Sequence, residues 1–176
     1  FEFVNAIVGG VIPSQFIPAV EKGVRQVLEG GAFAGFPIQD VRVTVYDGKY
    51  HAVDSKEIAF VSAGRKAFLD AIAKANPVVL EPIADVEITA PSDSMGDVAG
   101  DLSSRRGRVS NTDSLAAGVV AISGQAPLAE MEDYQSKLKS MTGGEGDFSM
   151  HFNAYEPAPL DVQKRLSNAF QRPEEE

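Results

Sequence analysis

The spacing of hydrophobic residues changes several times along the chain, and each change marks a predicted element. The stretch "VRVTV", residues 41–45, alternates apolar and polar side chains, which predicts a half-buried strand. Residues 17–29 place valine and leucine three and four positions apart, which predicts a helix that a glycine pair ends. A second helix is predicted from Asp54 to about Ala75, and "FEFVNAIV" has the apolar content of a strand. The first 80 residues therefore predict one small α/β module.

From about residue 82 the pattern changes to strand, helix, strand, strand, helix, strand. The strands are predicted in "DVEIT", "RVSNTD", "VVAISGQA" and "DFSMHFNAY", and the helices in "MGDVAGDL" and near residues 128–140. This βαββαβ order predicts a ferredoxin-like module, residues 81–156, whose helices cover one face of a four-stranded antiparallel sheet. A last helix is predicted at 159–170, and the acidic end at 171–176 is expected to be disordered. We therefore expect an α+β chain of two small α/β modules.

Composition limits the classes of protein and of site. Hydrophobic residues make up 44% of the 176 residues and charged residues 23%, which is enough to build packed cores. The chain has no cysteine, which excludes disulfides, thiolate metal sites and cysteine nucleophiles. No apolar run approaches 18 residues, so no membrane span is predicted. The lack of cysteine suits a cytoplasmic protein, and a start at Phe1 rather than Met suggests part of a longer one.

The chain is acidic, with a formal net charge of −9 and a pI of about 4.7. A free nucleic-acid binder is usually basic, so we expect no DNA partner. Any contact with RNA must come from local basic spots. The densest is "SSRRGR", with Arg105, Arg106 and Arg108 at the end of a predicted helix, and Lys137 and Lys139 give weaker support. Two interpretations stay open: favourable charges at a helix C-terminus, or a phosphate contact.

The two histidines, His51 and His151, are candidates for catalytic or metal-binding groups. His51 and Asp54 are residue types that can serve as a general base and the group that orients it. Asp54 is also a good helix cap, with Glu57 three residues later in a capping-box arrangement. His151 lies in a predicted strand of the other module, so a shared metal site is not expected. The glycine-rich stretches lack the Lys-Ser/Thr ending of a phosphate-binding loop. The residues alone therefore predict a non-catalytic chain without a bound cofactor or metal.

Several long stretches resemble elongation factor G, the GTPase that drives translocation on the bacterial ribosome. They are "FEFVNAIVGGVIPSQFIPAVEKG", "FPIQDVRVTVYDGKYHAVDSKEIAF", "NPVVLEPI", "MGDVAGDLSSRRGRV", "PLAEM" and "FSMHFNAYEPAP", in matching order and spacing. The resemblance implies that residues 1–80 form the fourth domain, a βαβ-type fold with a left-handed crossover. It implies the fifth, ferredoxin-like domain for residues 81–156, with helix 159–170 returning to the fourth. A strand that precedes the segment matched by "FEFVNAIV" in the family is missing, so an open edge of the fourth-domain sheet, or a partner chain that fills it, is expected.

The resemblance also implies a partner and a site. In the family the fourth domain enters the decoding centre of the ribosome, where its tip meets rRNA and the tRNA–mRNA duplex. The tip residues carried over to this chain are Ser14, Gln15, Gly48, Lys49, Tyr50 and His51. A histidine suits such a site because it can donate to phosphate or a 2′-hydroxyl and stack on a base. GTP and Mg²⁺ are expected in a G domain outside these residues, so no catalysis is expected here.

Three departures from the family pattern point to a specialised relative of the main factor. Ser14-Gln15 stands where a lysine-acid pair is common, and the fifth-domain helix reads "MEDYQSKLKS" in place of a Gly-Tyr pattern. Glu145 stands where a basic residue is common, in a domain that lies near rRNA. The alternative function is therefore that of an elongation factor G-like paralogue in ribosome recycling or rescue.

Overall fold

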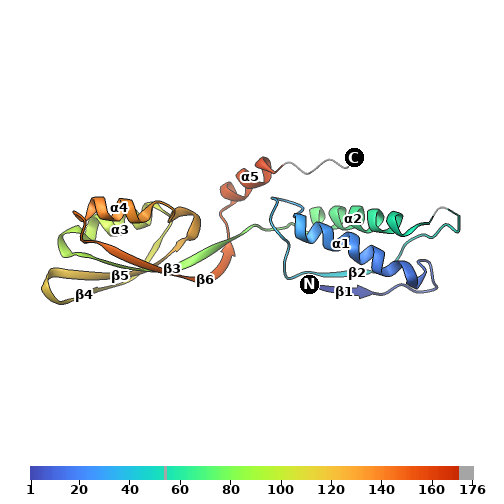
Figure 1. Cartoon of the computed structure of the whole chain (residues 1–176), viewed down its shortest axis with the longest axis horizontal. Helices are drawn as coiled ribbons and strands as arrows, with labels where there is room; N and C mark the ends of the chain where they lie inside the picture. The colour runs from blue at the N-terminus through green and yellow to red at the C-terminus, as the bar shows by residue number, and fades with distance from the viewer. Residues whose placement is uncertain (54, 171–176) are drawn as a thin grey trace. The chain divides into compact units, whose positions relative to one another are not determined.

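The computed structural model describes residues 1–53 and 55–170 (Figure 1). The chain divides into two compact units, which are described one at a time. Unit 1 comprises residues 1–79 and the segment that begins at Pro159, and unit 2 comprises Leu80–Ala158. Among the described residues, no helix has the length and apolar character needed to cross a bilayer.

Unit 1 is built on two parallel strands, β1 (Glu2–Asn5) and β2 (Arg42–Val45). They are joined through a short 3-10 turn, η1 (Ser14–Phe16), and helix α1 (Ile17–Gly30), which confirms the predicted βαβ arrangement. The left hand of that crossover stays a prediction. Within the described residues this sheet has only these two strands, so each strand has one edge without a partner strand.

Helices α1 and α2 (Glu57–Lys74) cross closely, and glycine makes the approach possible. A Cβ atom at Gly23 would collide with the backbone carbonyl of Val61, and one at Gly64 would lie 2.6 Å from the carbonyl oxygen of Val20. Helix α1 buries valine and leucine against the inner face of the sheet, and α2 buries valine and phenylalanine. Close packing at the crossing therefore depends on these two glycines.

Helix α5 (Leu160–Ala169) belongs to unit 1 although it comes last in the chain. The Oε1 atom of its buried Gln163 accepts a hydrogen bond of 3.2 Å from the amide of Val79. A groove of about 620 Å³ runs between α5, the end of α2 and the loop after α1.

Unit 2 is a four-stranded antiparallel sheet in the order β4-β5-β3-β6, with two helices on one face, which confirms the ferredoxin-like prediction. Its elements are β3 (Leu80–Pro91), α3 (Met95–Ser104), β4 (Arg108–Ser114), β5 (Val119–Pro127), α4 (Tyr134–Met141) and β6 (Asp147–Pro157). Short 3-10 turns occur at η2 (Ser92–Ser94), η3 (Ala116–Gly118) and η4 (Leu128–Glu130). Alternate residues of β3 and β5 face the helices and form a fully buried core, centred on Ile88, Leu102, Ile122, Tyr134 and Leu138.

Two predicted helix starts differ from the structure. The helix expected near 128–140 is divided, because the backbone carbonyl of Glu130 accepts from the Arg105 side chain and a separate turn precedes Tyr134. The helix expected from Asp54 begins at Glu57, with Lys56 as the N-cap residue in an extended conformation. Asp54 itself lies outside the described residues.

Candidate nucleic-acid interface

The loops that follow β1 and β2 lie together at one end of unit 1, which we call the tip (the right-hand end of Figure 1). Because the two strands are parallel, their carboxyl ends meet at the same end of the sheet. The first tip loop comprises residues 6–16, and the second comprises residues 46–53, 55 and 56. Helices α1 and α2 both begin at this end, at Ile17 and Glu57, so their positive dipole ends also lie there.

All six predicted tip residues lie in these two loops. Ser14 and Gln15 belong to η1 in the first loop, and both are exposed. Lys49, Tyr50 and His51 are exposed in the second loop. Gly48 is half-buried, and a Cβ atom there would collide with the side chain of Ile12, so the two loops are in contact at this position. The structure therefore brings together residues that are about 35 positions apart in the sequence.

Side chains within the second tip loop close its turns. The Oδ1 atom of Asp47 accepts a 2.7 Å hydrogen bond from the amide of Gly48. The Oγ atom of Ser55 accepts a 2.8 Å bond from the amide of His51, and the Ser55 amide donates to the His51 carbonyl at 3.0 Å. His51 is thus held at its backbone from both sides. Ser55 was not predicted, since a serine before a helix is ordinarily interpreted as a cap.

Aromatic rings join the two tip loops to the core of unit 1. The Phe16 ring stacks on Phe60 of α2 with centroids 4.5 Å apart, and its centroid lies 6.0 Å from that of Tyr50. Phe60 is buried, Phe16 is half-buried, and 44% of Tyr50 is exposed. No sequence signal marks this column, because its members are 10 to 44 positions apart and follow no shared motif.

The exposed chemistry of the tip suits RNA. Tyr46 is 76% exposed at the end of β2, and with Tyr50 it offers aromatic faces on which bases can stack. Lys49 and Lys56 are exposed cations that can meet phosphate. Asp54, the partner that a hydrolase interpretation of His51 requires, lies outside the described residues.

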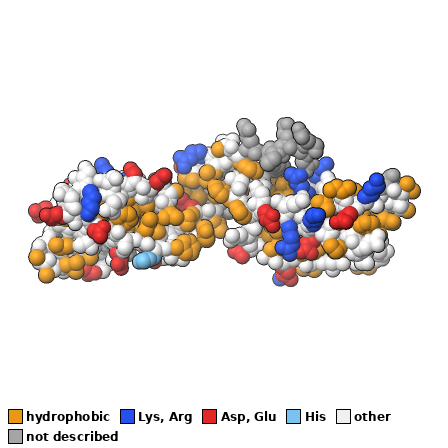
Figure 2. All heavy atoms as spheres, viewed as in Figure 1, with side chains coloured by type: hydrophobic (Ala, Val, Ile, Leu, Met, Phe, Trp, Pro, Cys, Tyr) orange, Lys and Arg blue, Asp and Glu red, His pale blue; other side chains and the backbone are white. Residues whose placement is uncertain are grey.

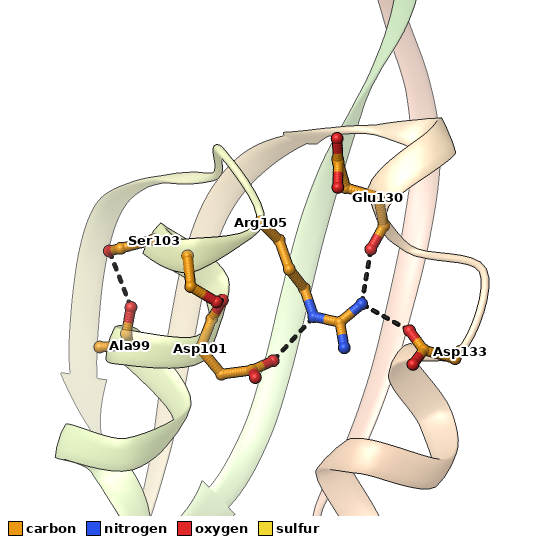
Figure 3. Close-up of polar contacts among 7 residues, drawn as sticks. Ala99, Asp101, Ser103, Arg105, Glu130 and Asp133 are labelled. Atoms are coloured by element: carbon orange, nitrogen blue, oxygen red, sulfur yellow. Dashed lines mark hydrogen bonds and ion pairs between the residues drawn. The ribbon is translucent and has the colours of Figure 1, made fainter.

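Arg105 in unit 2 is engaged within its own unit (Figure 3). Its Nε atom donates to Asp101 at 2.8 Å, and its Nη1 atom donates at 2.6 Å to both the Glu130 carbonyl and the Asp133 carboxylate. The guanidinium also lies 5.2 Å from the centroid of the Tyr134 ring. Its side chain is only 14% exposed, and hydrogen bonding to Asp133 raises its pKa. Arg105 therefore ties α3 to η4 and α4.

The other two arginines of "SSRRGR" are also paired. Arg106 donates to both carboxylate oxygens of Glu81, at 2.7 and 2.8 Å, and to Glu130, and the Glu81 bonds raise its pKa. The more exposed Arg108 donates to Glu156 at 2.9 Å. Ion pairing, rather than the helix dipole, is thus the structural role of this run. A phosphate contact by these three residues stays a prediction.

Charge is unevenly divided between the units. Residues 80–158 hold 5 Lys and Arg against 13 Asp and Glu, a net of −8, while the remaining residues hold 11 against 12, a net of −1. Figure 2 shows Lys and Arg side chains across unit 1. The weaker candidates in unit 2 include Lys137, which is exposed, and Lys139, which donates to the Gly144 carbonyl at 3.2 Å. Unit 2 is therefore acidic on balance, and Glu145 is exposed as well.

His151 lies on β6 opposite Asp85 of β3, in unit 2. Hydrogen bonds from Asn153 at 2.7 Å and Gln125 at 2.9 Å lower the pKa of Asp85, and His151 adds a smaller effect. The described residues contain no group of three or more His, Asp or Glu placed to hold a metal ion.

Two family models match the chain and divide it near the boundary between Val79 and Leu80, although the second also includes the start of α5. Residues 1–76 match the family model described as elongation factor G, domain IV, and residues 78–166 match that for the elongation factor G C-terminus. An elongation factor G-like protein of Thermotoga maritima is 48% identical over 166 residues, which are 94% of this chain and 24% of that protein. A crystal structure of a protein from Thermus thermophilus matches with a TM-score of 0.74 and 37% identity, over 95% of this chain and 25% of that one. The chain thus spans about a quarter of these proteins. With both units matched, the chain belongs to the elongation factor G family and corresponds to its domain IV and C-terminal domain.

Proposed function

We propose that this chain is the ribosome-binding part of a cytoplasmic translational GTPase that promotes GTP-dependent translocation of tRNA and mRNA. The observation that carries the proposal is the tip, where the loop with exposed His51, Lys49 and Tyr50 contacts the loop with exposed Ser14 and Gln15. Membership of the elongation factor G family supplies the reaction class. In this proposal the tip enters the decoding site and meets the tRNA–mRNA duplex and rRNA.

The chain itself has a binding role in this proposal. GTP and Mg²⁺ would be held by a G domain outside these residues, which the family's factors carry. The chemistry of the tip fits the assignment, since a histidine donor, two lysines and two exposed tyrosine rings can contact phosphate, 2′-hydroxyl and base. The near-neutral charge of unit 1 also lets it approach RNA with less repulsion than unit 2 meets.

The test is single-round translocation by the full-length protein, measured beside ribosome-stimulated GTP hydrolysis. We expect His51→Ala to slow translocation by about tenfold, since base and phosphate contacts of this kind are each worth roughly 1–3 kcal/mol. GTP hydrolysis should keep its wild-type rate. The matched control is His151→Ala, which removes the other histidine, in unit 2, and should leave both rates unchanged. Equal translocation by wild type and His51→Ala would refute the role of the tip.

A second candidate is ribosome recycling or rescue by a specialised paralogue. Two observations favour it: the uncharged pair Ser14-Gln15 at the tip, and a relative at 48% identity that is named elongation factor G-like. The acidic balance of unit 2 and the exposed Glu145 also weaken an rRNA contact there. Subunit splitting with ribosome recycling factor present decides between the two, because a specialised paralogue would split ribosomes and hydrolyse GTP without translocating.

A further inference from the structure

We infer that Phe16 is a positioning residue for the tip, and that the ring column Phe60–Phe16–Tyr50 orders the second tip loop before it meets RNA. The inference rests on the proposed function, because it assigns to Phe16 a part in presenting His51 and Tyr50. Phe16 itself contributes no exposed polar group to the tip. Its effect must therefore pass through Tyr50, which it contacts.

The column begins at a rigid point. Phe60 is buried in the first full turn of α2, only 6% exposed, and belongs to the same core cluster as Val61 and Ile12. Phe16 stacks on it with an interplanar angle of 15° and centroids 4.5 Å apart. Aromatic pairs at such distances add stabilisation beyond the area they bury. The last residue of the first tip loop is thus fixed to a helix.

The column ends at the second tip loop. Tyr50 lies 6.0 Å from Phe16 with a tilt of 30° between the rings, next to His51 in sequence. Two further contacts act on the same loop: Gly48 lies against Ile12, and Ser55 bonds the His51 backbone from both sides. The loop is therefore held at three points, and Phe16 supplies the one that reaches the residue beside His51.

Preorganisation has a functional consequence. A loop that is ordered before binding does not lose its conformational freedom on the ribosome, so more of the contact energy remains for binding. Without the Phe16 ring, Tyr50 loses the side chain it packs against. The backbone around His51 can then adopt more conformations. We therefore expect Phe16 to affect translocation only through the contacts that Tyr50 and His51 make with RNA.

The experiment compares Phe16→Leu with Phe16→Tyr in the full-length protein. The leucine variant removes the ring, and we expect translocation to slow by about 3- to 10-fold, in keeping with the usual strength of an aromatic pair. The tyrosine variant keeps the ring and should translocate at the wild-type rate. Phe36→Leu, a matched change at a 53% exposed phenylalanine in another loop of unit 1, should also leave the rate unchanged.

Two readouts separate positioning from general loss of structure. Hydrogen exchange at the His51 and Ser55 amides should quicken in Phe16→Leu, while exchange in α1 stays as in wild type. Phe16→Leu should slow translocation no further when it is added to the double variant Tyr50→Ala/His51→Ala, because the two residues that it positions are then already removed. If Phe16→Leu unfolds unit 1, Phe16→Met takes its place, since it keeps more volume against Phe60.

The possible failures are distinguishable. Wild-type translocation by Phe16→Leu, with His51→Ala slow, would overturn the positioning role and leave the proposed function standing. A further slowing when Phe16→Leu is added to Tyr50→Ala/His51→Ala would overturn it as well, because Phe16 would then act through another residue. If His51→Ala itself translocates normally, the proposed function fails and this inference fails with it.

Discussion

The two units use their polar side chains in opposite ways. In unit 1 the tip leaves Lys49, Tyr50 and His51 exposed on a loop that is held from beneath by rings and backbone bonds. In unit 2 the densest basic run in the sequence is paired with carboxylates of the same unit, through Arg105 and Arg106 above all. A run of arginines is thus no evidence of a phosphate contact until their partners are known. The tip is therefore the better candidate for an RNA contact, although it has fewer basic residues than the arginine run.

The largest test of this comparison concerns helix packing. Helices α1 and α2 of unit 1 approach closely through Gly23, whereas Gly100 in α3 of unit 2 has open space where a Cβ would go. We expect Gly23→Ala to destabilise unit 1 by about 3 kcal/mol, because the helices must move apart. Gly100→Ala should stabilise unit 2 by about 0.5–1 kcal/mol through helix propensity.

Urea unfolding followed by hydrogen exchange, with peptides assigned to each unit, measures both glycine variants. Unit 2 peptides should not change in Gly23→Ala. An unchanged unfolding free energy of unit 1 would mean that its helices are packed less closely than the structure has them.

The second test compares the stability lost on removing a largely buried arginine and an exposed arginine of unit 2. Arg105→Ala leaves Asp101, 14% exposed at its side chain, without its ion pair, and should cost about 2 kcal/mol of unfolding free energy. Arg108→Ala removes an exposed pair with Glu156 and should cost less than about 1 kcal/mol. Equal costs for the two variants would contradict the clamping role of Arg105. Chemical denaturation at neutral pH gives both values.

The cost of Arg105→Ala should also depend on pH. Hydrogen bonding from Arg105 lowers the pKa of Asp133 below its ordinary 3.8. A carboxyl group whose pKa is lowered on folding stabilises the folded chain at pH values above its pKa in the unfolded chain. This stabilisation is lost as the pH falls through the pKa of the folded chain. The difference between wild type and variant should therefore shrink below about pH 4. Denaturation at pH 7, 5 and 3 checks this, and a difference that grew on acidification would contradict it.

The smallest expected effect concerns a buried hydroxyl in unit 2. Among the described residues, the Tyr134 hydroxyl is buried without a hydrogen-bond partner, and burial raises the pKa of Tyr134 to about 12. Tyr134→Phe should change stability by less than about 1 kcal/mol, in the stabilising direction, because an unsatisfied buried group is removed. Wild type should also lose stability from pH 10 to 12, since the unfolded chain releases this proton first. The phenylalanine variant should lack that loss, and thermal unfolding at pH 9 and 11 would show it. A large destabilisation would mean that the hydroxyl has a partner.

The sequence by itself determined the order of the elements. Alternation over 41–45 and the three-and-four spacing over 17–29 are local signals, because they follow from the repeat of a strand or a helix. The βαββαβ order and the family resemblance are likewise contained in short stretches, and the ferredoxin-like sheet followed from them. Helix α2 begins later than the sequence predicts, because Ser55 bonds the loop that carries His51. The sequence does not reveal that contact, since serine serves loops and caps alike.

Only the tertiary structure decided which side chains meet. Arg105 forms an ion pair with Asp133, which is 28 positions away. Phe16 packs against Tyr50 and Phe60, which lie 34 and 44 positions later in the chain. Gly23 is required by a helix that begins 34 residues later. Such pairings depend on how elements pack, and packing is set by shapes summed over the whole unit rather than by any local period. The sequence could therefore name His51 as a tip residue, but not the ring beneath its neighbour.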